Sequence, residues 1–254
     1  MMRIMAKLLK AVYSVYAGFT FVLIMLLIFP FAFIATFFGS IRGGNRVYRL
    51  CMFWADLWFP LIFIRHIRIF EAPHDKSKSY IFLSNHISYL DAAIIPKAYR
   101  QPIRPLGKVE MSKVPVFGFI YRNAIVTVDR SSPANRTKSV RVLKSLINKG
   151  ISVLVFPEGT FNMGTAPLKE FYDGAFRVAI ETQTPIKPVL FLDAYQRMPY
   201  QSLFLMSPGI SRIVYLDEIP VENYTTDDVS VLKQEVYKIM EGKLLYYNAA
   251  RRKA

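Results

Sequence analysis

The chain of 254 residues is strongly basic, with 33 Lys or Arg against 18 Asp or Glu and a net charge of +15. Its length suits one larger domain, or one domain with an appendage. The single cysteine, Cys51, excludes an internal disulfide and a thiolate metal cluster, and it is consistent with a reducing compartment. Residues 97–149 alone hold twelve Lys or Arg and two acids. Such a segment favours an anionic partner, which could be nucleic acid, a phospholipid surface or a phosphorylated substrate.

An apolar stretch lies near the start of the chain. Residues 11–41 contain no charged residue, and this run exceeds the roughly 20 residues that cross hydrocarbon. It is also too long for a cleaved signal peptide. Pro30 would kink the run or turn it back. Residues 51–64 form a second, shorter apolar stretch that is typical of an interfacial or re-entrant segment. We therefore predict a membrane-embedded helical segment over residues 1–64, as one span or a re-entrant hairpin, followed by an α/β domain over residues 65–254.

The membrane segment bears on the choice of anionic partner. Lipid headgroups become the favoured partner, whereas nucleic acid is disfavoured because the aromatic residues are concentrated in apolar runs and are not interleaved with the basic ones. Three basic residues flank the first apolar run on each side, so the positive-inside rule does not orient it.

From about residue 66, short apolar runs alternate with longer amphipathic ones, which is typical of an α/β domain. The runs 151–156 and 188–192 are apolar on both faces and predict central strands covered by helices on each side. The expected strands are 66–70, 80–84, 124–128, 151–156, 187–192 and 212–216. The expected helices are 133–149, with Ser132 as N-cap and Gly150 at its end, 168–182 and 227–247. The sequence thus predicts an α/β fold with a mixed, largely parallel sheet flanked by helices.

One polar stretch, Asn85 to Asp91, follows the apolar run that predicts the second strand. His86 in this stretch precedes Asp91 by five residues. A histidine oriented by a carboxylate is a common base near neutral pH. Residues five apart differ by roughly 140° around a regular helix, so the pair can meet only if His86 lies in the turn between strand and helix.

Further polar residues come at the ends of other predicted strands. Lys108 precedes the strand 124–128, and Asp129 and Arg130 follow it, while Glu158 follows the strand 151–156. Ligands of open α/β sheets bind beyond the carboxyl ends of the strands. His86, Arg130 and Glu158 are therefore expected to converge on one crevice.

These residues resemble the motifs of the glycerolipid acyltransferases, over roughly residues 60–220. Four blocks of that family occur in order. They are Asn85-His86 with Ser88 and Asp91; Lys108 with Pro115, Gly118 and Asp129-Arg130; Phe156-Pro157-Glu158-Gly159-Thr160; and Pro185-Ile186 with Pro188-Val189. A helix that begins Phe171-x-x-Gly174-Ala175 also resembles the one that precedes the fourth block.

The resemblance implies a role for each matching residue. His86 would take the proton of a glycerol hydroxyl as it attacks an acyl thioester, with Asp91 orienting the imidazole. Lys108 and Arg130 would bind the phosphate of the acceptor. The acceptor pocket would be shaped by the third block, namely Glu158, Gly159 and Thr160, with Asn85, Ser88 and Pro157 in support. No cofactor, metal or acyl-enzyme is implied, and the sequence contains no G-x-S-x-G elbow.

One position departs from the family pattern. Many members have Arg after Glu-Gly-Thr, where it helps to bind phosphate, but here Phe161 follows Thr160. Either Lys108, Arg130 and a basic residue from elsewhere, such as Arg122, suffice, or the acceptor carries no phosphate.

The sequence therefore predicts a membrane-bound O-acyltransferase. It would move an acyl group from acyl-CoA or acyl-carrier protein to the sn-2 hydroxyl of lysophosphatidic acid, within a phospholipid membrane. The expected location is a bacterial inner membrane, with the site on the cytoplasmic face. The alternatives are an O-acyltransferase for a lyso-aminolipid and, more remotely, a non-catalytic basic adaptor.

Overall fold

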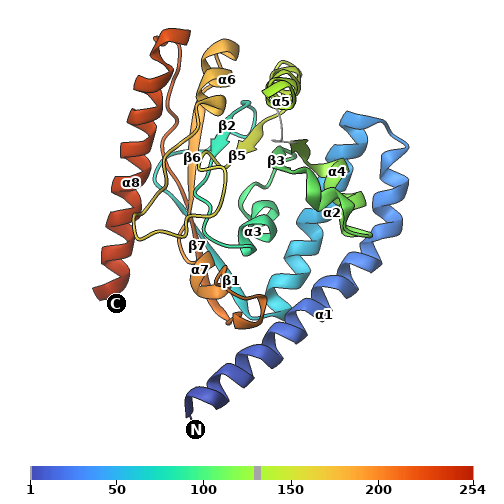
Figure 1. Ribbon diagram of the computed structural model, residues 1–254. Helices are drawn as coiled ribbons and strands as arrows, with labels where there is room; N and C mark the ends of the chain where they lie inside the picture. Colours follow the sequence, from blue (N-terminus) through green and yellow to red (C-terminus); the bar gives the residue numbers. More distant parts are fainter. Residues whose placement is uncertain (1, 129–132, 254) are drawn as a thin grey trace.

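The computed structural model describes residues 2–128 and 133–253, and Figure 1 shows the arrangement of its elements. The helices are α1 (Met2–Thr36), α2 (Ser40–Leu61), α3 (Leu90–Ala98), α4 (Phe117–Ala124), α5 (Pro133–Ile147), α6 (Gly174–Thr182), α7 (Ala194–Arg197) and α8 (Val229–Lys253). The strands are β1 (Ile64–Phe70), β2 (Ile81–Leu83), β3 (Arg104–Lys108), β4 (Val126–Val128), β5 (Val153–Val155), β6 (Ile186–Phe191) and β7 (Gly209–Tyr215). Short 3-10 helices cover Val109–Lys113, Leu203–Leu205 and Thr226–Asp228.

The strands form one seven-stranded sheet in the order β1-β7-β6-β2-β5-β3-β4. Strands β6, β2, β5, β3 and β4 run parallel, β7 runs antiparallel to β6, and β1 is parallel to β7. The predicted α/β class with a mixed, largely parallel sheet is confirmed. The two runs that are apolar on both faces, β5 and β6, lie on either side of β2 near the centre of the sheet, as expected.

The residues of β2 show how the sheet separates two apolar layers. Phe82 packs with side chains of α2 and α3, whereas Ile81 and Leu83 pack with side chains of α6 and α8. Figure 1 shows α6 and α8 on one side of the sheet and α2, α3 and α4 on the other. All three side chains are fully buried. Burial of such side chains contributes about 1.5–3 kcal/mol each, so this short strand is held from both faces.

The first apolar stretch forms a single helix that does not end at Pro30. Helix α1 continues to Thr36, and the chain turns back at residues 37–39, where Gly39 has φ of +81°. Of the two alternatives predicted at Pro30, a kink or a turn back, the turn back is not observed. A proline removes one backbone hydrogen bond, and the apolar residues on both sides of Pro30 keep the helix continuous. The second apolar stretch falls mostly within α2, which packs along α1.

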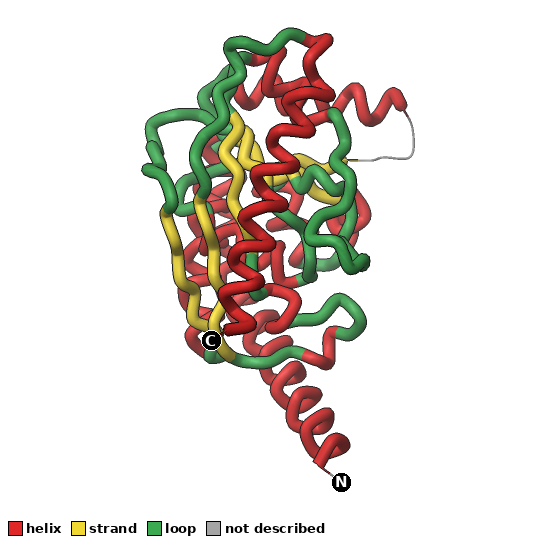
Figure 2. The backbone as a smooth tube through the Cα atoms, turned by 90° about the vertical axis from the view of Figure 1, so that its left-hand side faces the viewer, coloured by secondary structure: helices red, strands yellow, loops and turns green. Residues whose placement is uncertain are grey.

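One helix is long and apolar enough to cross a membrane. Residues Ile4–Thr36 have a mean hydropathy of 2.5 in their most apolar window, of which a third is buried. Figures 1 and 2 show the N-terminal part of α1 extending away from the sheet. Its outward side chains are large and apolar, and they include Leu8, Phe19 and Leu27. This surface suggests association with a membrane.

The inner face of α1 is bonded to the rest of the protein. The Trp58 indole donates to the Ala17 carbonyl at 3.0 Å, and the Ser14 hydroxyl accepts the Met206 N–H at 3.0 Å. The Tyr13 hydroxyl donates to the Ile62 carbonyl. The helix is therefore fixed to α2 and to the segment before β7. The division into segments at residues 64 and 65 stays a prediction.

Two local predictions need correction. The helix expected over 168–182 begins only at Gly174, because the chain before it forms a loop that crosses the carboxyl end of the sheet. The strand β3 was not predicted, since Arg104-Pro105-Leu106-Gly107-Lys108 has no strand-like alternation. The helix 133–149 is observed as α5, with Gly150 at φ of +73° after it, and Ser132 lies outside the described residues.

Candidate active site

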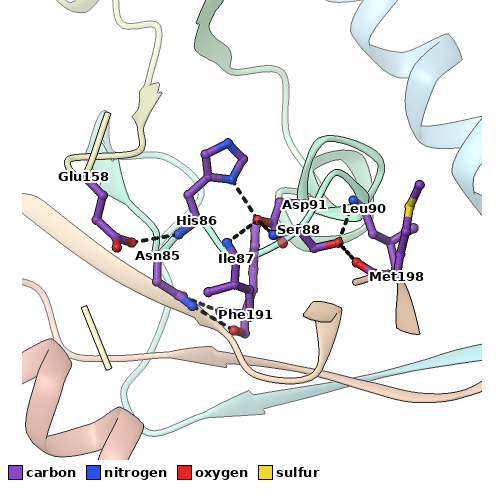
Figure 3. Close-up of polar contacts among 9 residues, drawn as sticks. All are labelled: Asn85, His86, Ile87, Ser88, Leu90, Asp91, Glu158, Phe191 and Met198. Atoms are coloured by element: carbon purple, nitrogen blue, oxygen red, sulfur yellow. Dashed lines mark hydrogen bonds and ion pairs between the residues drawn. The ribbon is translucent and has the colours of Figure 1, made fainter. Parts of the chain in front are cut away.

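The side chains of His86 and Asp91 meet in the turn between β2 and α3. His86 Nδ1 lies 2.7 Å from Asp91 Oδ2, and the backbone N–H groups of Ile87 and Ser88 donate to the same oxygen at 2.7 and 2.9 Å. Figure 3 shows these three bonds. The contact that the resemblance implies, and that the five-residue spacing allows only in a turn, is present. It forms because the chain leaves β2 in an irregular turn and brings Asp91 into the first turn of α3.

The bond defines which imidazole nitrogen is available for chemistry. An ionised carboxylate only accepts hydrogen bonds, so Nδ1 of His86 carries the proton and Nε2 keeps a lone pair. The Asp91 side chain is fully buried, whereas that of His86 is 20% exposed. The site thus offers an oriented nitrogen base at the surface, backed by a buried carboxylate.

Two neighbouring side chains fasten the turn to other elements. The Asn85 amide bonds twice to the backbone of Phe191, at the end of β6. The Ser88 hydroxyl donates to the Met198 carbonyl at 2.5 Å and accepts the Leu90 N–H at 3.0 Å (Figure 3). These contacts assign positioning roles to Asn85 and Ser88.

The loop after β5 encloses His86. Strands β2 and β5 pair with Leu83 opposite Val155, so His86 and Glu158 each lie three residues beyond the sheet on adjacent strands. The imidazole stacks on the Phe156 ring, with centroids 4.2 Å apart, and meets the edge of the Phe161 ring at 4.2 Å. Two aromatic rings therefore limit the movement of the base.

Glu158 ties this loop together from a buried position. One carboxylate oxygen accepts the backbone N–H of His86 at 2.8 Å, and the other accepts the backbone N–H of Lys169 at 2.9 Å. The side chain is 1% exposed. Burial raises the pKa of Glu158, while the two N–H donors act in the opposite direction. The carboxylate thus binds backbone groups of two loops.

The remaining residues of the third block shape the same loop. Gly159 has φ of +74°, a conformation that L side chains rarely adopt, and this explains glycine after Glu158. The Thr160 hydroxyl accepts a hydrogen bond from the Lys169 ammonium at 2.7 Å. The Pro157 carbonyl accepts a hydrogen bond from the backbone N–H of Tyr172.

The predicted phosphate ligands are only partly placed. Lys108 ends β3, next to β5, so it lies at the carboxyl edge of the sheet, where it is 70% exposed and its ammonium is 3.6 Å from Glu110. Arg130 and Asp129 lie outside the described residues. The guanidinium of Arg122 lies 5.3 Å from the Phe119 ring centroid.

The fourth block lies away from His86. Its Ile186 pairs with Ile81 at the start of β2 and its Pro188 with Leu83 at the end of that strand, so the block begins at the opposite edge of the sheet and runs alongside β2. Lys187 within it is fully buried and donates to the Pro73 carbonyl at 2.8 Å. This block supports the sheet. Across residues 2–128 and 133–253, no three His, Cys, Asp or Glu side chains gather that could hold a metal ion.

Two features of the site escaped the sequence analysis. Lys169 reaches the third block from a loop that was predicted to be helix, so its approach could not be foreseen. The contacts of the His86 ring with Phe156 and Phe161 also went unnoticed, although an aromatic residue at each end of the Phe156–Phe161 loop was a visible signal.

Comparison with known proteins identifies the family. Residues 66–192 match the family model described as Acyltransferase, and this match covers half of the chain. The chain belongs to the acyltransferase family. It is an acyltransferase enzyme related to the lysophosphatidic acid acyltransferases.

Several curated relatives carry names from this family. The chain is 29% identical over 173 residues to an uncharacterized acyltransferase of Schizosaccharomyces pombe, covering 67% of this chain and 62% of that protein. It is 28% identical over 204 residues to the human 1-acyl-sn-glycerol-3-phosphate acyltransferase alpha, covering 78% of this chain and 70% of the human protein. The chain thus spans less than two thirds of the first relative and slightly more of the second.

A solved structure has the same fold. The crystal structure of the 1-acyl-sn-glycerophosphate acyltransferase PlsC from Thermotoga maritima superimposes with a TM-score of 0.75 at 18% identity, covering 97% of this chain and 98% of that one. The likeness extends over both the sheet and the N-terminal helices.

Proposed function

We propose that the protein transfers a fatty acyl group from acyl-CoA or acyl-carrier protein to the sn-2 hydroxyl of 1-acyl-sn-glycerol-3-phosphate, giving phosphatidic acid. The observation that carries this proposal is the bond between His86 and Asp91, which leaves Nε2 available as a base on a side chain that is 20% exposed. The names of several relatives, including the human enzyme, favour this acceptor.

The reaction would run without an acyl-enzyme. His86 Nε2 removes the proton from the acceptor hydroxyl as its oxygen attacks the thioester carbonyl, and Asp91 stabilises the charged imidazolium. The tetrahedral intermediate then collapses, the C–S bond breaks, and the imidazolium returns the proton to the thiolate. Base catalysis of this kind contributes about 10²- to 10⁴-fold, so positioning at the membrane must supply much of the rest.

The apolar surface of α1 supports a location at a membrane, where acceptor and product dissolve. A soluble donor requires the site to face the cytosol, and we propose the cytoplasmic face of a bacterial inner membrane. The N-terminal helices would hold the site close to the lipid surface.

A second acceptor class is favoured by one contact. Phe161 stands where many family members carry a phosphate-binding arginine, and its ring packs against His86. A lyso-aminolipid would use the same base without needing that arginine.

The test is transfer of labelled acyl groups from acyl-CoA to lysophosphatidate in detergent micelles, with wild type, His86→Ala and Arg130→Ala. We expect phosphatidate from the wild type, loss of turnover in His86→Ala, and mainly a raised KM for the acceptor in Arg130→Ala. Acylation of lyso-aminolipids but not of lysophosphatidate would refute the proposed acceptor and leave the base in place.

A further inference from the structure

The loop between β5 and α6 brings a cation beside the catalytic turn. Lys169 is half-buried in this loop, and its ammonium lies 2.7 Å from the Thr160 hydroxyl. Thr160 directly precedes Phe161, whose ring contacts the imidazole of His86 at 4.2 Å between centroids. The Lys169 ammonium is therefore bonded to Thr160, and the next residue, Phe161, contacts the imidazole of His86.

The backbone of Lys169 is fixed independently of its side chain. Its N–H donates to Glu158 Oε2, and Glu158 Oε1 accepts the N–H of His86. The same loop is bound a second time, since the Asn162 N–H donates to the His86 carbonyl at 2.8 Å. One carboxylate thus sets the position of Lys169 relative to His86 before any substrate binds.

The charge of Lys169 is not neutralised by a carboxylate in the part of the chain that the structure describes. Other half-buried lysines there do have acidic partners: Lys97 pairs with Asp56, Lys144 with Glu181 and Lys233 with Asp173. The carboxylate of Glu158, which binds the backbone N–H of Lys169, accepts a second backbone N–H from His86 and does not pair with the Lys169 ammonium. A half-buried cation whose side-chain bond is to a neutral hydroxyl can accept an anion at little cost.

We propose that Lys169, together with the Thr160 hydroxyl, binds the phosphate of the acceptor. The inference rests on the proposed function, whose acceptor it deepens. On binding, the Lys169 ammonium donates to phosphate oxygens, and Thr160 turns its hydroxyl from acceptor to donor. Phe161, which stands in place of the family arginine, contacts the imidazole of His86. The positive charge that binds the phosphate comes instead from Lys169, eight residues further along the loop.

Other described cations are less well placed. The ammonium of Lys108 is 70% exposed and already 3.6 Å from Glu110. The guanidinium of Arg122 faces the ring of Phe119 on α4. Neither is bonded to the loop that encloses His86.

The test compares Lys169→Met, Lys169→Arg and Lys149→Met with the wild type. Methionine keeps most of the aliphatic stem and leaves the backbone bond to Glu158 in place. Lys149 is exposed beyond α5, near the start of β5, so its replacement removes the same charge at the opposite edge of the sheet. Each protein is assayed in detergent micelles with lysophosphatidate and with 1-monoacylglycerol, which offers a hydroxyl but no phosphate.

We expect Lys169→Met to raise KM for lysophosphatidate on the order of ten- to a hundredfold, the effect of losing a charge-assisted hydrogen bond. Its kcat, and its kinetics with 1-monoacylglycerol, should stay near wild type. Lys169→Arg should recover much of the loss, and Lys149→Met should match the wild type.

Three results would overturn the inference, and they are distinguishable. If Lys169→Met and Lys149→Met behave alike while the wild type makes phosphatidate, Lys169 does not bind phosphate and the proposed function stands. An equal loss with both acceptors would reveal a structural role. If the wild type acylates only the phosphate-free acceptor in a His86-dependent way, both the inference and the proposed acceptor fail.

Discussion

The carboxylate of Asp91 holds Nδ1 of His86 at 2.7 Å while two backbone N–H groups of the intervening turn bind the same oxygen. The six residues from His86 to Asp91 are therefore held around one oxygen atom. The imidazole cannot rotate away without breaking its bond to a carboxylate that the backbone of the turn holds in place. The base is positioned by the local fold before substrate arrives.

Replacement of Asp91 by Asn should abolish most turnover. Asparagine would place its amide oxygen in the Oδ2 position, where it keeps the bonds from Nδ1 and from the two backbone N–H groups, but it would lack the negative charge that stabilises the imidazolium formed in the reaction. We expect kcat to fall on the order of 10²- to 10⁴-fold with little change in acceptor KM. Steady-state kinetics would measure this, with the exposed Asp227→Asn as control. A variant with kcat within tenfold of wild type would contradict the role of the Asp91 charge.

Glu158→Gln should weaken both stability and catalysis. A glutamine has one acceptor oxygen for two backbone N–H groups, and its NH₂ would oppose the second. A buried donor without a partner costs about 1–3 kcal/mol. We expect a lower Tm and a lower kcat, because the backbone of His86 loses an anchor. The exposed Glu170→Gln, in the same loop, is the matched control. Equal Tm values for the two variants would mean that the two backbone bonds contribute nothing to stability.

Phe161→Leu should reduce kcat by a smaller amount. Phe161 contacts the rings of both His86 and Tyr89. An aromatic pair contributes about 0.5–1.5 kcal/mol beyond burial, so kcat should fall roughly two- to tenfold as the imidazole gains freedom. Tyr172→Leu, at an exposed aromatic residue of the same loop, serves as control. A raised acceptor KM with unchanged kcat would instead indicate a direct contact with substrate.

His66 should make stability depend on pH in mild acid. Its ring packs against Phe59, and burial lowers its pKa from 6.5 to about 3. The unfolded chain therefore binds the proton more tightly, and folding stability falls as the pH drops from about 6.5 towards 3, by about 1.4 kcal/mol per pH unit at most. His66→Phe should remove this dependence. Thermal unfolding of both proteins at pH 7 and pH 5 tests it, and parallel losses of Tm would refute it.

The sheet was largely predictable because its buried strands are continuous apolar runs. Residues 153–155 of β5 and 189–191 of β6 fill both faces with Val, Leu and Phe, a pattern with few other interpretations. Strand β3 was not predictable, because its residues owe their extended form to pairing with β4 and β5. Arg104 in this strand is buried and bonded to Asn45 of α2, a partner that no local pattern could reveal.

The site was predictable where its residues are close in sequence. The contact of His86 with Asp91 depends on one turn, and the sequence constrains that turn closely. Glu158 was identified as a site residue, but its bonding was not, since its partners are backbone groups of two separate loops. Lys169 was missed for the same reason, because a loop path depends on tertiary bonds and not on periodicity.

Helix α1 has an exposed apolar face and an opposite face that is bonded to the rest of the protein. Its outer face, with Leu8, Phe19 and Leu27, is unsuited to water, while its inner face supplies the bonds to Trp58 and Met206. A shortened chain without α1 would lack the exposed apolar face of that helix. It would, however, expose the indole of Trp58 and the apolar side chains beside it, which α1 covers. The helix that carries the apolar surface is therefore also a packing partner of α2 and of the segment before β7, so a change to α1 affects the α/β body as well.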